Sequence, residues 1–226
     1  MLNKAMREIV AKARKTGWIL EPDAKRMLGL AGVNIPDFKM AATMEEAVAA
    51  ADRIGYPVVA KVVSPDIMHK SDVQGVKVGI RDAEALQKTF ADFSTKKGFC
   101  GVLVEEMVTG TELIIGALID YQFGPVILLG VGGTGVEIYQ DTAIRMAPVA
   151  EEDVIAMVGS LKGAALLKGY RGEDPVNIQD LTQLMLSVSN LVMALEDDMA
   201  SMDLNPVKCD QSRCVVADAR IILAAE

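Results

Sequence analysis

Histidine, cysteine and aromatic residues are scarce in this sequence of 226 residues. It contains one histidine, three cysteines and 4% aromatic residues. A single histidine cannot complete a histidine-rich zinc site, and Cys100, Cys209 and Cys214 form no Cys-x-x-Cys pair. The odd number of cysteines without metal-ligand spacing favours reduced, buried thiols over catalytic ones.

The sequence also lacks a basic excess and a long apolar run. It has 23 lysines and arginines against 31 acidic residues, which gives a formal charge of −8. Nucleic acids and anionic membranes bind basic surfaces, so we expect no nucleic-acid partner and no membrane partner. Charged residues, glycine and proline interrupt the apolar runs well before the ~18 residues of a spanning helix. Residues 1–17 are amphipathic rather than a signal peptide, which predicts a cytoplasmic protein.

Apolar residues make up 51% of the chain, enough for one large domain or two smaller lobes with their own cores. Thr43 and Glu46 form a capping box at the start of a predicted helix, which Gly55 ends. The next apolar runs, 58–63 and 75–80, predict two strands joined in a hairpin with a long polar tip.

The remaining sequence alternates between β-rich and helical runs. A helix between Asp82 and Lys97 is followed by three β-rich runs, and a long helical pattern precedes two short strands near the C-terminus. This arrangement predicts the α+β class with two lobes. We expect an amphipathic helix and lead-in over residues 1–20, an N-terminal lobe over 21–107 and a C-terminal lobe over 108–226.

Gly130, Gly132 and Gly135 have the spacing Gly-x-Gly-x-x-Gly after an apolar strand, as in dinucleotide-binding sites. That fingerprint also requires a helix from the last glycine. The following residues, 136–140, are β-rich and predict a strand instead. We interpret the glycines as positions where the backbone closely approaches a ligand or another chain.

Three charged residues suggest nucleotide chemistry. Lys61 lies near the end of an apolar strand, where its ammonium could contact a phosphate, although a solvated lysine is the commoner explanation. Glu105 and Glu112 flank an apolar hinge. This hinge could recognise an adenine edge and a ribose hydroxyl, or it could be an acidic strand edge with a turn.

A second group of residues suggests metal and phosphoryl chemistry. Asp203, Asn205 and Asp218 offer oxygen ligands of the kind that Mg²⁺ takes, while turn chemistry explains Asn-Pro equally well. His69, the only histidine, lies in the polar segment PDIMHKSDVQG. Taken alone, such a histidine is more often structural or solvated than catalytic.

Five segments follow one another along the chain: GYPVVAKVVSPDIMHKSDVQGV, VEEMVTGTELIIG, GPVILLGVGGTGVE, LLKGYRGEDP and MDLNPV. In this order they resemble the ATP-grasp β subunit of ADP-forming acyl-CoA synthetases, relatives of succinyl-CoA synthetase. The resemblance covers nearly the whole chain and implies an ATP-grasp fold of two subdomains, each with a β-sheet and packed helices. It also implies a ligase that interconverts acyl-CoA, ADP and phosphate with acid, ATP and CoA, with ATP/ADP and Mg²⁺ as cofactors. A partner α subunit would carry the CoA-binding domain and a phosphorylated histidine, in an α2β2 assembly.

The resemblance further implies roles for individual residues. His69 matches a histidine that accepts a phosphoryl group and relays it between the α-subunit histidine and ADP. The residues implied to bind the nucleotide are Lys61, Ser71, Gly75, Glu105, Met107, Val108, Glu112 and Arg145. Asn205 and Asp218 match the metal ligands, and Asp203 is a candidate neighbour of the metal or of the acceptor.

Within that set, the resemblance assigns Lys61 and, on weaker grounds, Arg145 to the phosphates. Glu105 with the following backbone would frame adenine, and Glu112 would bind ribose. The family commonly has Gly-Gly where this chain has Gln74 before its glycine, which puts in doubt how closely the loop covers the phosphates. The alternative function is an ATP-grasp nucleotide-binding or regulatory module without phosphoryl transfer.

Overall fold

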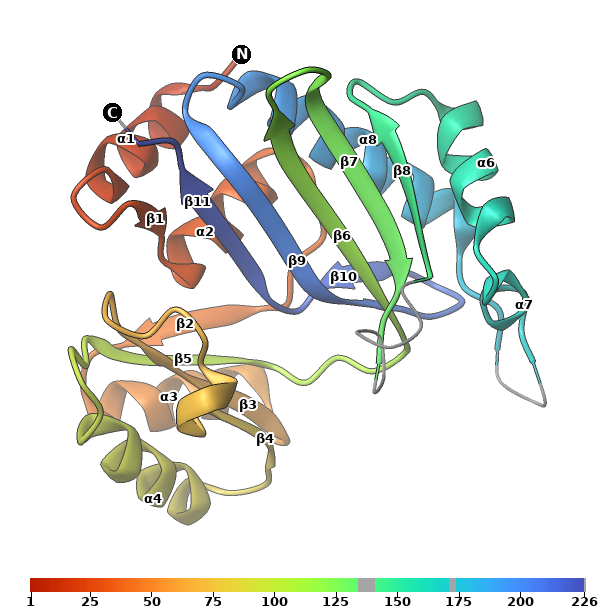
Figure 1. The fold of residues 1–226 in the computed structure, drawn as a ribbon. Helices are drawn as coiled ribbons and strands as arrows, with labels where there is room; N and C mark the ends of the chain where they lie inside the picture. Colours follow the sequence, from red (N-terminus) through yellow and green to blue (C-terminus); the bar gives the residue numbers. More distant parts are fainter. Residues whose placement is uncertain (134–140, 171–173, 226) are drawn as a thin grey trace. The chain divides into compact units, whose positions relative to one another are not determined.

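The computed structural model describes residues 1–133, 141–170 and 174–225. The chain divides into two compact units, whose elements are labelled in Figure 1. The larger unit combines residues 1–35 with residues from 109 onward, and the smaller unit comprises residues 36–108. Both units contain helices and antiparallel sheets, which confirms the α+β class.

One of the two expected domain boundaries is wrong. The boundary after residue 107 lies one residue from the division after Val108, but residues 21–35 belong to the larger unit and not to the smaller one. The reason is packing: helix α2 (Glu21–Leu30) buries Met27 and Leu28 in the core of the larger unit. The sequence shows that this helix has an apolar face but not which core receives it.

The smaller unit is a four-stranded antiparallel sheet in the order β2-β5-β3-β4, with two helices on one face. Its elements are β2 (Phe38–Ala41), α3 (Met44–Ile54), β3 (Val58–Val63), the 3-10 helix η1 (Ser71–Val73), β4 (Val76–Ile80), α4 (Ala83–Ser94) and β5 (Gly101–Glu106). The predicted hairpin of β3 and β4 is confirmed, and η1 lies in its polar connection.

Helix α3 begins almost as its capping sequence predicts. The Glu46 N–H donates to Thr43 Oγ1 over 3.2 Å, which is half of the capping box. The Glu46 carboxylate accepts the N–H of Ala42 over 2.8 Å, one residue earlier than the box requires. Gly55 follows the helix at a φ of +96°, a backbone conformation that favours glycine, and ends the helix.

Alternation along β3 decides which of its residues meet the helices. Val58, Ala60 and Val62 enter the apolar core formed with α3 and α4. Successive strand side chains point to opposite faces of a sheet, so Val59 and Lys61 project from the other face. The position of Lys61 therefore follows from the period of two that defines the strand.

The larger unit contains a seven-stranded antiparallel sheet in the order β1-β11-β9-β6-β7-β8, with β10 also paired to β9. Its strands are β1 (Trp18–Ile19), β6 (Thr111–Asp120), β7 (Gly124–Val131), β8 (Thr142–Met146), β9 (Met199–Cys209), β10 (Cys214–Val216) and β11 (Ala219–Leu223). Its helices are α1 (Lys4–Ala13), α2, α6 (Glu151–Ser160), α7 (Ala164–Leu167) and α8 (Ile178–Ala194). None of the helices within the described residues is long and apolar enough to cross a membrane. The strand expected over residues 136–140 lies outside the described residues.

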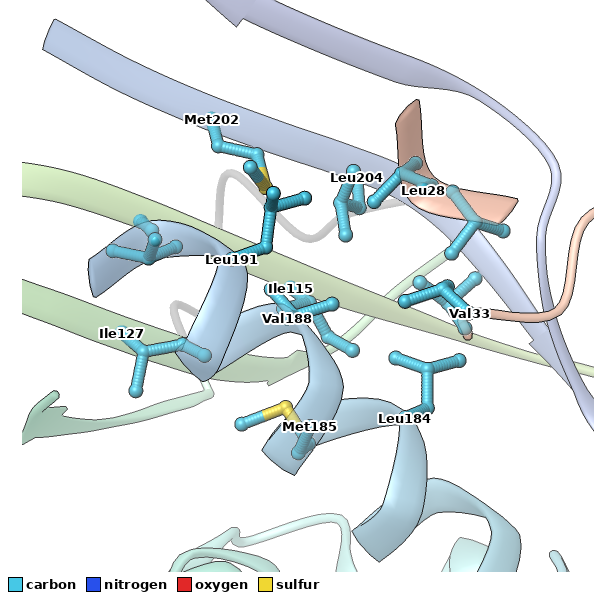
Figure 2. Close-up of a cluster of buried hydrophobic side chains, with 14 of the residues drawn as sticks. Leu28, Val33, Ile115, Ile127, Leu184, Met185, Val188, Leu191, Met202 and Leu204 are labelled. Atoms are coloured by element: carbon cyan, nitrogen blue, oxygen red, sulfur yellow. The ribbon is translucent and has the colours of Figure 1, made fainter. Parts of the chain in front are cut away.

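Helix α8 packs against one face of this sheet and confirms the long helical pattern. Figure 2 shows its side chains beside those of the strands, with labels on Leu184, Met185, Val188, Leu191, Ile115, Ile127, Met202 and Leu204. All of these residues are nearly or fully buried. Residues at the alternate positions of β6 and β9 therefore project from the opposite face of the sheet.

The C-terminal region differs from the two short strands that the sequence predicts. Strand β9 has 11 residues and is followed by two more strands, β10 and β11. Pro206 lies inside β9, although a proline normally excludes a central strand. A bulge at this proline accommodates it, and the bulge also hides the strand period in the sequence.

The expectation of three reduced, buried thiols is wrong. Cys209 and Cys214 form a disulfide, and the free cysteine, Cys100, is exposed. Antiparallel pairing of β9 and β10 sets Cys209 opposite Cys214, with their Cα atoms 4.1 Å apart. The two short strands predicted near the C-terminus did not include Cys209. The sequence therefore did not indicate that β9 extends to this residue and sets it opposite Cys214.

Candidate functional site

Lys61 and Glu105 form a buried ion pair in the smaller unit. Lys61 Nζ lies 2.8 Å from Glu105 Oε1, and the two side chains are 6% and 3% exposed. Lys61 pairs with Leu103 and Glu105 pairs with Val59, so the two charged side chains lie diagonally on one face of the sheet. Burial makes either charge costly without the other. The carboxylate expected beside adenine is thus bound to the lysine expected beside phosphate.

His69 lies in the connection between β3 and β4, and its side chain is exposed. Ser71, the first residue of η1, is exposed as well. Hydrogen bonds fix both ends of this connection. Ser64 Oγ donates to the carbonyl of residue 97 over 2.7 Å, and the Val62 N–H donates to the Gly75 carbonyl over 2.8 Å. The loop therefore presents an accessible imidazole from an anchored base.

Gly75 is the residue that lets this loop approach β3. A Cβ at this position would lie 2.4 Å from Val62 Cγ1 and 3.0 Å from the Lys70 carbonyl oxygen. The Gly75 N–H donates to the same Lys70 oxygen over 2.7 Å. Gln74 has a left-handed backbone, with φ 53° and ψ 36°, a conformation that glycine adopts most readily. The resemblance leads us to expect two glycines at these positions. In this chain, Gly75 has no room for a side chain, and Gln74 takes a left-handed backbone conformation without being glycine.

Met107 and Val108 follow β5 and are half-buried. Immediately before them, the Glu106 N–H donates to the Asp37 carbonyl over 2.8 Å, and Glu106 Oε2 accepts the Asp37 N–H over 3.3 Å. These two bonds fix the end of β5 against the segment that leads into β2. The backbone expected to frame adenine therefore follows an ordered strand end.

In the larger unit, Glu112 and Lys208 form a second ion pair. Lys208 Nζ donates to Glu112 Oε1 over 2.5 Å, and the side chains of Lys208 and Glu112 are 21% and 38% exposed. The two residues are direct partners in the pairing of β6 with β9. Because their neighbours Leu113 and Val207 are buried in the core, the pair projects from the face opposite α8.

Gly132 holds the backbone of Glu112 on its other side. The Gly132 N–H donates to the Glu112 carbonyl over 2.7 Å, and a Cβ on Gly132 would lie 2.9 Å from three atoms of Glu112. One glycine of the GVGGTG segment thus permits a close backbone approach, as the sequence predicts, although the segment approached is β6. Gly135, the last glycine of that segment, lies outside the described residues.

Asn205 and Asp218 meet at the bulge in β9. Two residues of β9, Asn205 and Pro206, oppose the single residue Ile114 of β6. On the other side of β9, the Asn205 N–H donates to the Asp218 carbonyl over 3.2 Å. The two expected metal ligands are therefore neighbours, and the bulge changes the direction of the Asn205 side chain relative to a regular strand.

Asp203 is bound by an arginine instead of lying free beside this pair. Arg220 Nη2 donates to Asp203 Oδ2 over 3.0 Å, and the two residues are direct partners in the pairing of β9 with β11. A guanidinium on this carboxylate competes with any direct role in metal binding. The Asp203 carboxylate therefore has a cationic partner on the neighbouring strand.

The donor set fits a metal ion shared with a ligand. Mg²⁺ in nucleotide sites takes one or two protein oxygens, together with water and phosphate oxygens. Asn205 and Asp218 supply oxygens of that kind. Over the described ranges of the chain, no group of three or more His, Cys, Asp or Glu residues could hold a metal ion by itself.

Arg145 is not brought together with these residues. It pairs with Ile127, a core residue, so its side chain leaves β8 on the face that α8 covers. Its Nη1 donates to the Ile144 carbonyl over 2.8 Å. Glu112 and Lys208 project from the other face of the same sheet.

Sequence reasoning did not single out Lys208 or Arg220, which bind two of the predicted carboxylates. The signal for both is cross-strand register, because Lys208 lies opposite Glu112 and Arg220 opposite Asp203. The register of β9 depends on the bulge at Pro206. From the sequence, the Asn-Pro pair at this point suggests only a turn. The basic partners therefore become visible only once the strands are paired.

The comparisons with known proteins agree with this fold. A model of the ATP-grasp domain matches residues 10–223, so the two units together form an ATP-grasp protein. The chain is 39% identical over 226 residues to the β subunit of acetate–CoA ligase (ADP-forming) I of Pyrococcus furiosus, a match that covers 96% of this chain and 97% of the relative. This chain belongs to the family of β subunits of ADP-forming acetate–CoA ligases.

Solved structures show the same fold. A crystal structure of a Pyrococcus horikoshii protein is 36% identical, with a TM-score of 0.93 and full coverage of both chains. The chain is also similar to the dinucleotide-forming acetyl-coenzyme A synthetase 1 of Candidatus Korarchaeum cryptofilum, with a TM-score of 0.86 and 38% identity, over 97% of this chain and 100% of that one. That protein was solved with coenzyme A and Mg-AMPPCP, and its phosphohistidine segment points towards the nucleotide binding site.

Proposed function

We propose that this chain is the nucleotide-binding subunit of an ADP-forming acyl-CoA synthetase. It transfers a phosphoryl group between ADP or ATP and a phosphohistidine. In the complete reaction, acyl-CoA, ADP and phosphate interconvert with the free acid, ATP and CoA. Family membership supports the reaction class. The observation that carries the transfer step is the exposed His69 on a loop fixed at both ends.

His69 serves as acceptor and donor of the phosphoryl group. An imidazole nitrogen is nucleophilic near neutral pH, and a nitrogen–phosphorus bond is readily broken by a second acceptor. Towards ATP, an oxygen of the ADP β-phosphate bonds to phosphorus while the His69 nitrogen–phosphorus bond breaks and returns its electron pair to the ring. Lys61 offsets the negative charge of the phosphates, and Gly75 keeps the loop backbone close to β3.

The other predicted residues bind and orient the nucleotide. The backbone at Met107 and Val108 frames adenine, and Glu112 binds ribose. Asn205 and Asp218 hold Mg²⁺ through their oxygens, and the ion supplies positive charge to the phosphate oxygens. Arg145 has no part in this proposal because its side chain leaves the sheet on the other face.

A partner subunit completes the enzyme. The Pyrococcus furiosus relative is named a β subunit, which supports an α partner for this chain. We infer that the partner carries the CoA-binding domain and its own phosphorylated histidine, that the assembly is α2β2, and that it works in the cytoplasm.

The test uses ATP labelled in its γ-phosphate, with Mg²⁺, on the wild type and on His69→Ala. We expect acid-labile label on the wild type, and none on His69→Ala although that variant still binds ADP by calorimetry. Met68→Ala changes an exposed neighbour in the same loop and keeps the label, which makes it the matched control. Label that persists on His69→Ala refutes the relay.

The alternative is a nucleotide-binding or regulatory module without phosphoryl transfer. It predicts that the wild type binds Mg-ATP and acquires no label, with or without a partner subunit. The anchored loop with its exposed imidazole favours the transfer reaction, because a module that only binds nucleotide has no use for an exposed imidazole.

A further inference from the structure

We propose that Lys208 positions the Glu112 carboxylate so that the site selects nucleotides with an intact ribose. This inference rests on the proposed function and names the substrate class of the same site, a ribonucleotide as opposed to a deoxyribonucleotide. Lys208 itself acts through Glu112 and is a positioning residue.

The first observation is the geometry of the pair. Lys208 lies directly opposite Glu112 in the sheet and binds one carboxylate oxygen, Oε1, over 2.5 Å. The other carboxylate oxygen, Oε2, has lone pairs that can accept a hydrogen bond from a ligand hydroxyl. The pair is partly buried, so water weakens it less than a fully exposed salt bridge.

The second observation is that the backbone on both sides of the pair is held in place. Glu112 is fixed by the bond from Gly132 to its carbonyl oxygen. Lys208 precedes Cys209, whose disulfide with Cys214 closes the β9–β10 hairpin. The side chain of Lys208 therefore begins from a constrained strand position.

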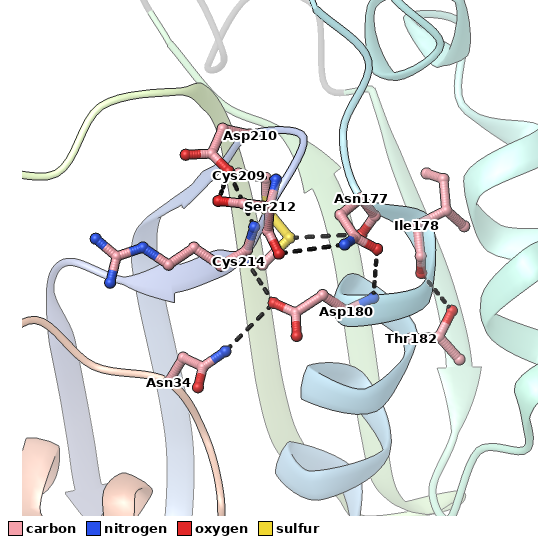
Figure 3. The surroundings of a disulfide bond; sticks show 10 residues. Asn34, Asn177, Ile178, Asp180, Thr182, Cys209, Asp210, Ser212 and Cys214 are labelled. Atoms are coloured by element: carbon pink, nitrogen blue, oxygen red, sulfur yellow. Dashed lines mark hydrogen bonds between the residues drawn. A yellow bond between two sulfur atoms is a disulfide. The ribbon is translucent and has the colours of Figure 1, made fainter.

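The hairpin is itself bound to the start of α8, as Figure 3 shows. The Cys214 N–H donates to Asp180 Oδ2 over 2.6 Å, and Asn177 Nδ2 donates to the Ser212 carbonyl over 3.2 Å. These bonds connect the β9–β10 hairpin, on which Lys208 lies, to a helix packed in the core. Such support is what keeps a positioning residue in one geometry.

The physical effect of Lys208 has two parts. A glutamate side chain loses rotamer freedom when it binds a ligand, and the ion pair removes much of that freedom before the nucleotide arrives. In addition, a carboxylate near a nucleotide is repelled by the phosphates, and the ammonium of Lys208 offsets this like-charge repulsion. Both effects act on binding of ribose and leave the chemical step at His69 unchanged.

Lys208→Met removes the ammonium and retains most of the side-chain length. We expect the dissociation constant for ADP to rise about tenfold, as for the loss of one charge-assisted contact. The ratio of the dissociation constant for 2′-deoxy-ADP or 3′-deoxy-ADP to that for ADP should fall towards one. The rate of label transfer to His69 at saturating ATP should change by less than about twofold, because the residue does not touch the reacting atoms.

The experiment measures these three quantities for the wild type, Lys208→Met and Lys208→Arg, by calorimetry and single-turnover labelling. Arginine keeps the charge and should restore most of the ribose preference. Lys96→Met is the control, because Lys96 is also a partly buried lysine in an ion pair, with Asp92 at the end of α4. It should behave as the wild type.

Two results overturn the inference. One is a Lys208→Met protein that keeps the full preference for ribose, and the other is an equal loss of affinity for ADP and for both deoxy analogues. If Lys208→Met does not fold, Lys208→Gln decides the question. It also removes the charge, and an unchanged preference for ADP over the deoxy analogues in this variant refutes the inference. A wild type that binds no nucleotide instead refutes the proposed function, and a wild type that binds ADP and its deoxy analogues equally refutes only the inference.

Discussion

At the scale of single residues, Gln74 and Gly75 are neighbours in the His69 loop that are constrained for different reasons. Gly75 needs the absence of a side chain, since a Cβ would lie 2.4 Å from Val62 Cγ1. Gln74 needs a backbone conformation that glycine prefers, at φ 53°, and its side chain is exposed. The constraint on Gly75 is steric, and that on Gln74 is conformational and milder.

We therefore expect Gly75→Ala to destabilise the protein by about 1–3 kcal/mol, the usual cost of forcing extra volume into a packed site. Gln74→Gly should change stability by less than about 1 kcal/mol, because relief of the left-handed backbone and added freedom in the unfolded chain oppose each other. Denaturant unfolding of both variants measures these values. Equal destabilisation by the two substitutions would contradict the distinction between them.

A second prediction for a single residue concerns the role of Arg145 in phosphoryl transfer. Its side chain leaves β8 on the face that carries Ile127, away from the Glu112–Lys208 pair. Arg145→Ala should therefore alter the rate of phosphoryl transfer to His69 less than about threefold, whereas removing a charge that contacts the transferring group costs far more. Single-turnover labelling compares it with Lys61→Met, which should lose most of the transfer. A loss of transfer rate of the same size in both variants would indicate that Arg145 contacts the phosphates.

At the scale of elements, the β9–β10 hairpin separates the two proposed metal ligands along the chain. Asn205 lies within β9, and Asp218 follows β10. Their backbones meet at the base, where Asn205 donates to the Asp218 carbonyl, while the Cys209–Cys214 disulfide closes the hairpin further along. Any loosening of the hairpin therefore affects the segment between these two proposed ligands.

The disulfide should contribute measurably to stability. Its cysteines are five residues apart, and the loop-entropy relation gives about 2 kcal/mol for a loop of this size. Cys209→Ala with Cys214→Ala should lower the free energy of unfolding by that amount without a reductant, and the wild type in a dithiol reductant should show a similar loss. Cys100→Ser, at the exposed free cysteine, serves as the control and should show neither effect. A reductant that leaves the wild type unchanged would indicate that the two thiols are not joined.

The turn of the same hairpin should make the stability of the protein depend on pH. The Ser212 hydroxyl, together with the backbone N–H groups of Arg213 and Ser212, lowers the pKa of Asp210 below its usual value. A carboxylate with a lower pKa in the folded state stabilises the fold above the unfolded pKa, near ~4, and loses that contribution as the pH falls through the folded pKa. The stability difference between wild type and Asp210→Asn should thus be constant near neutral pH and shrink below pH ~4. Unfolding curves at several acidic pH values measure it, and a difference that grows on acidification would contradict the assignment.

The elements also show where the sequence was sufficient and where it was not. Strand β3 and helix α4 follow from period and capping, which are local properties. The placement of α2 in the larger unit, the bulge at Pro206 and the pairing of Cys209 with Cys214 depend on which segments meet in space. For the candidate site, motif resemblance singled out the carboxylates, Lys61 and His69, but the basic partners Lys208 and Arg220 required the strand register.

At the scale of the whole molecule, all described elements belong to the two units of one ATP-grasp domain. Each unit has its own sheet and core, and the described residues contain no further layer of parallel strands and helices such as a CoA-binding domain needs. In the enzyme proposed above, this chain binds the nucleotide and carries His69, and the partner binds the acyl group and CoA.

The purified chain should therefore bind Mg-ATP and exchange label with His69, yet form no acyl-CoA from acetate, ATP and CoA. Addition of an α subunit from a related two-subunit enzyme, or of the natural partner isolated with this chain, should restore thioester formation detected by chromatography. His69→Ala must remain inactive in the reconstituted enzyme, because the partner cannot replace the acceptor on this chain. Robust acyl-CoA formation by the chain alone would show that the partner is dispensable, and full activity of reconstituted His69→Ala would show that the exposed histidine is not on the path of the phosphoryl group.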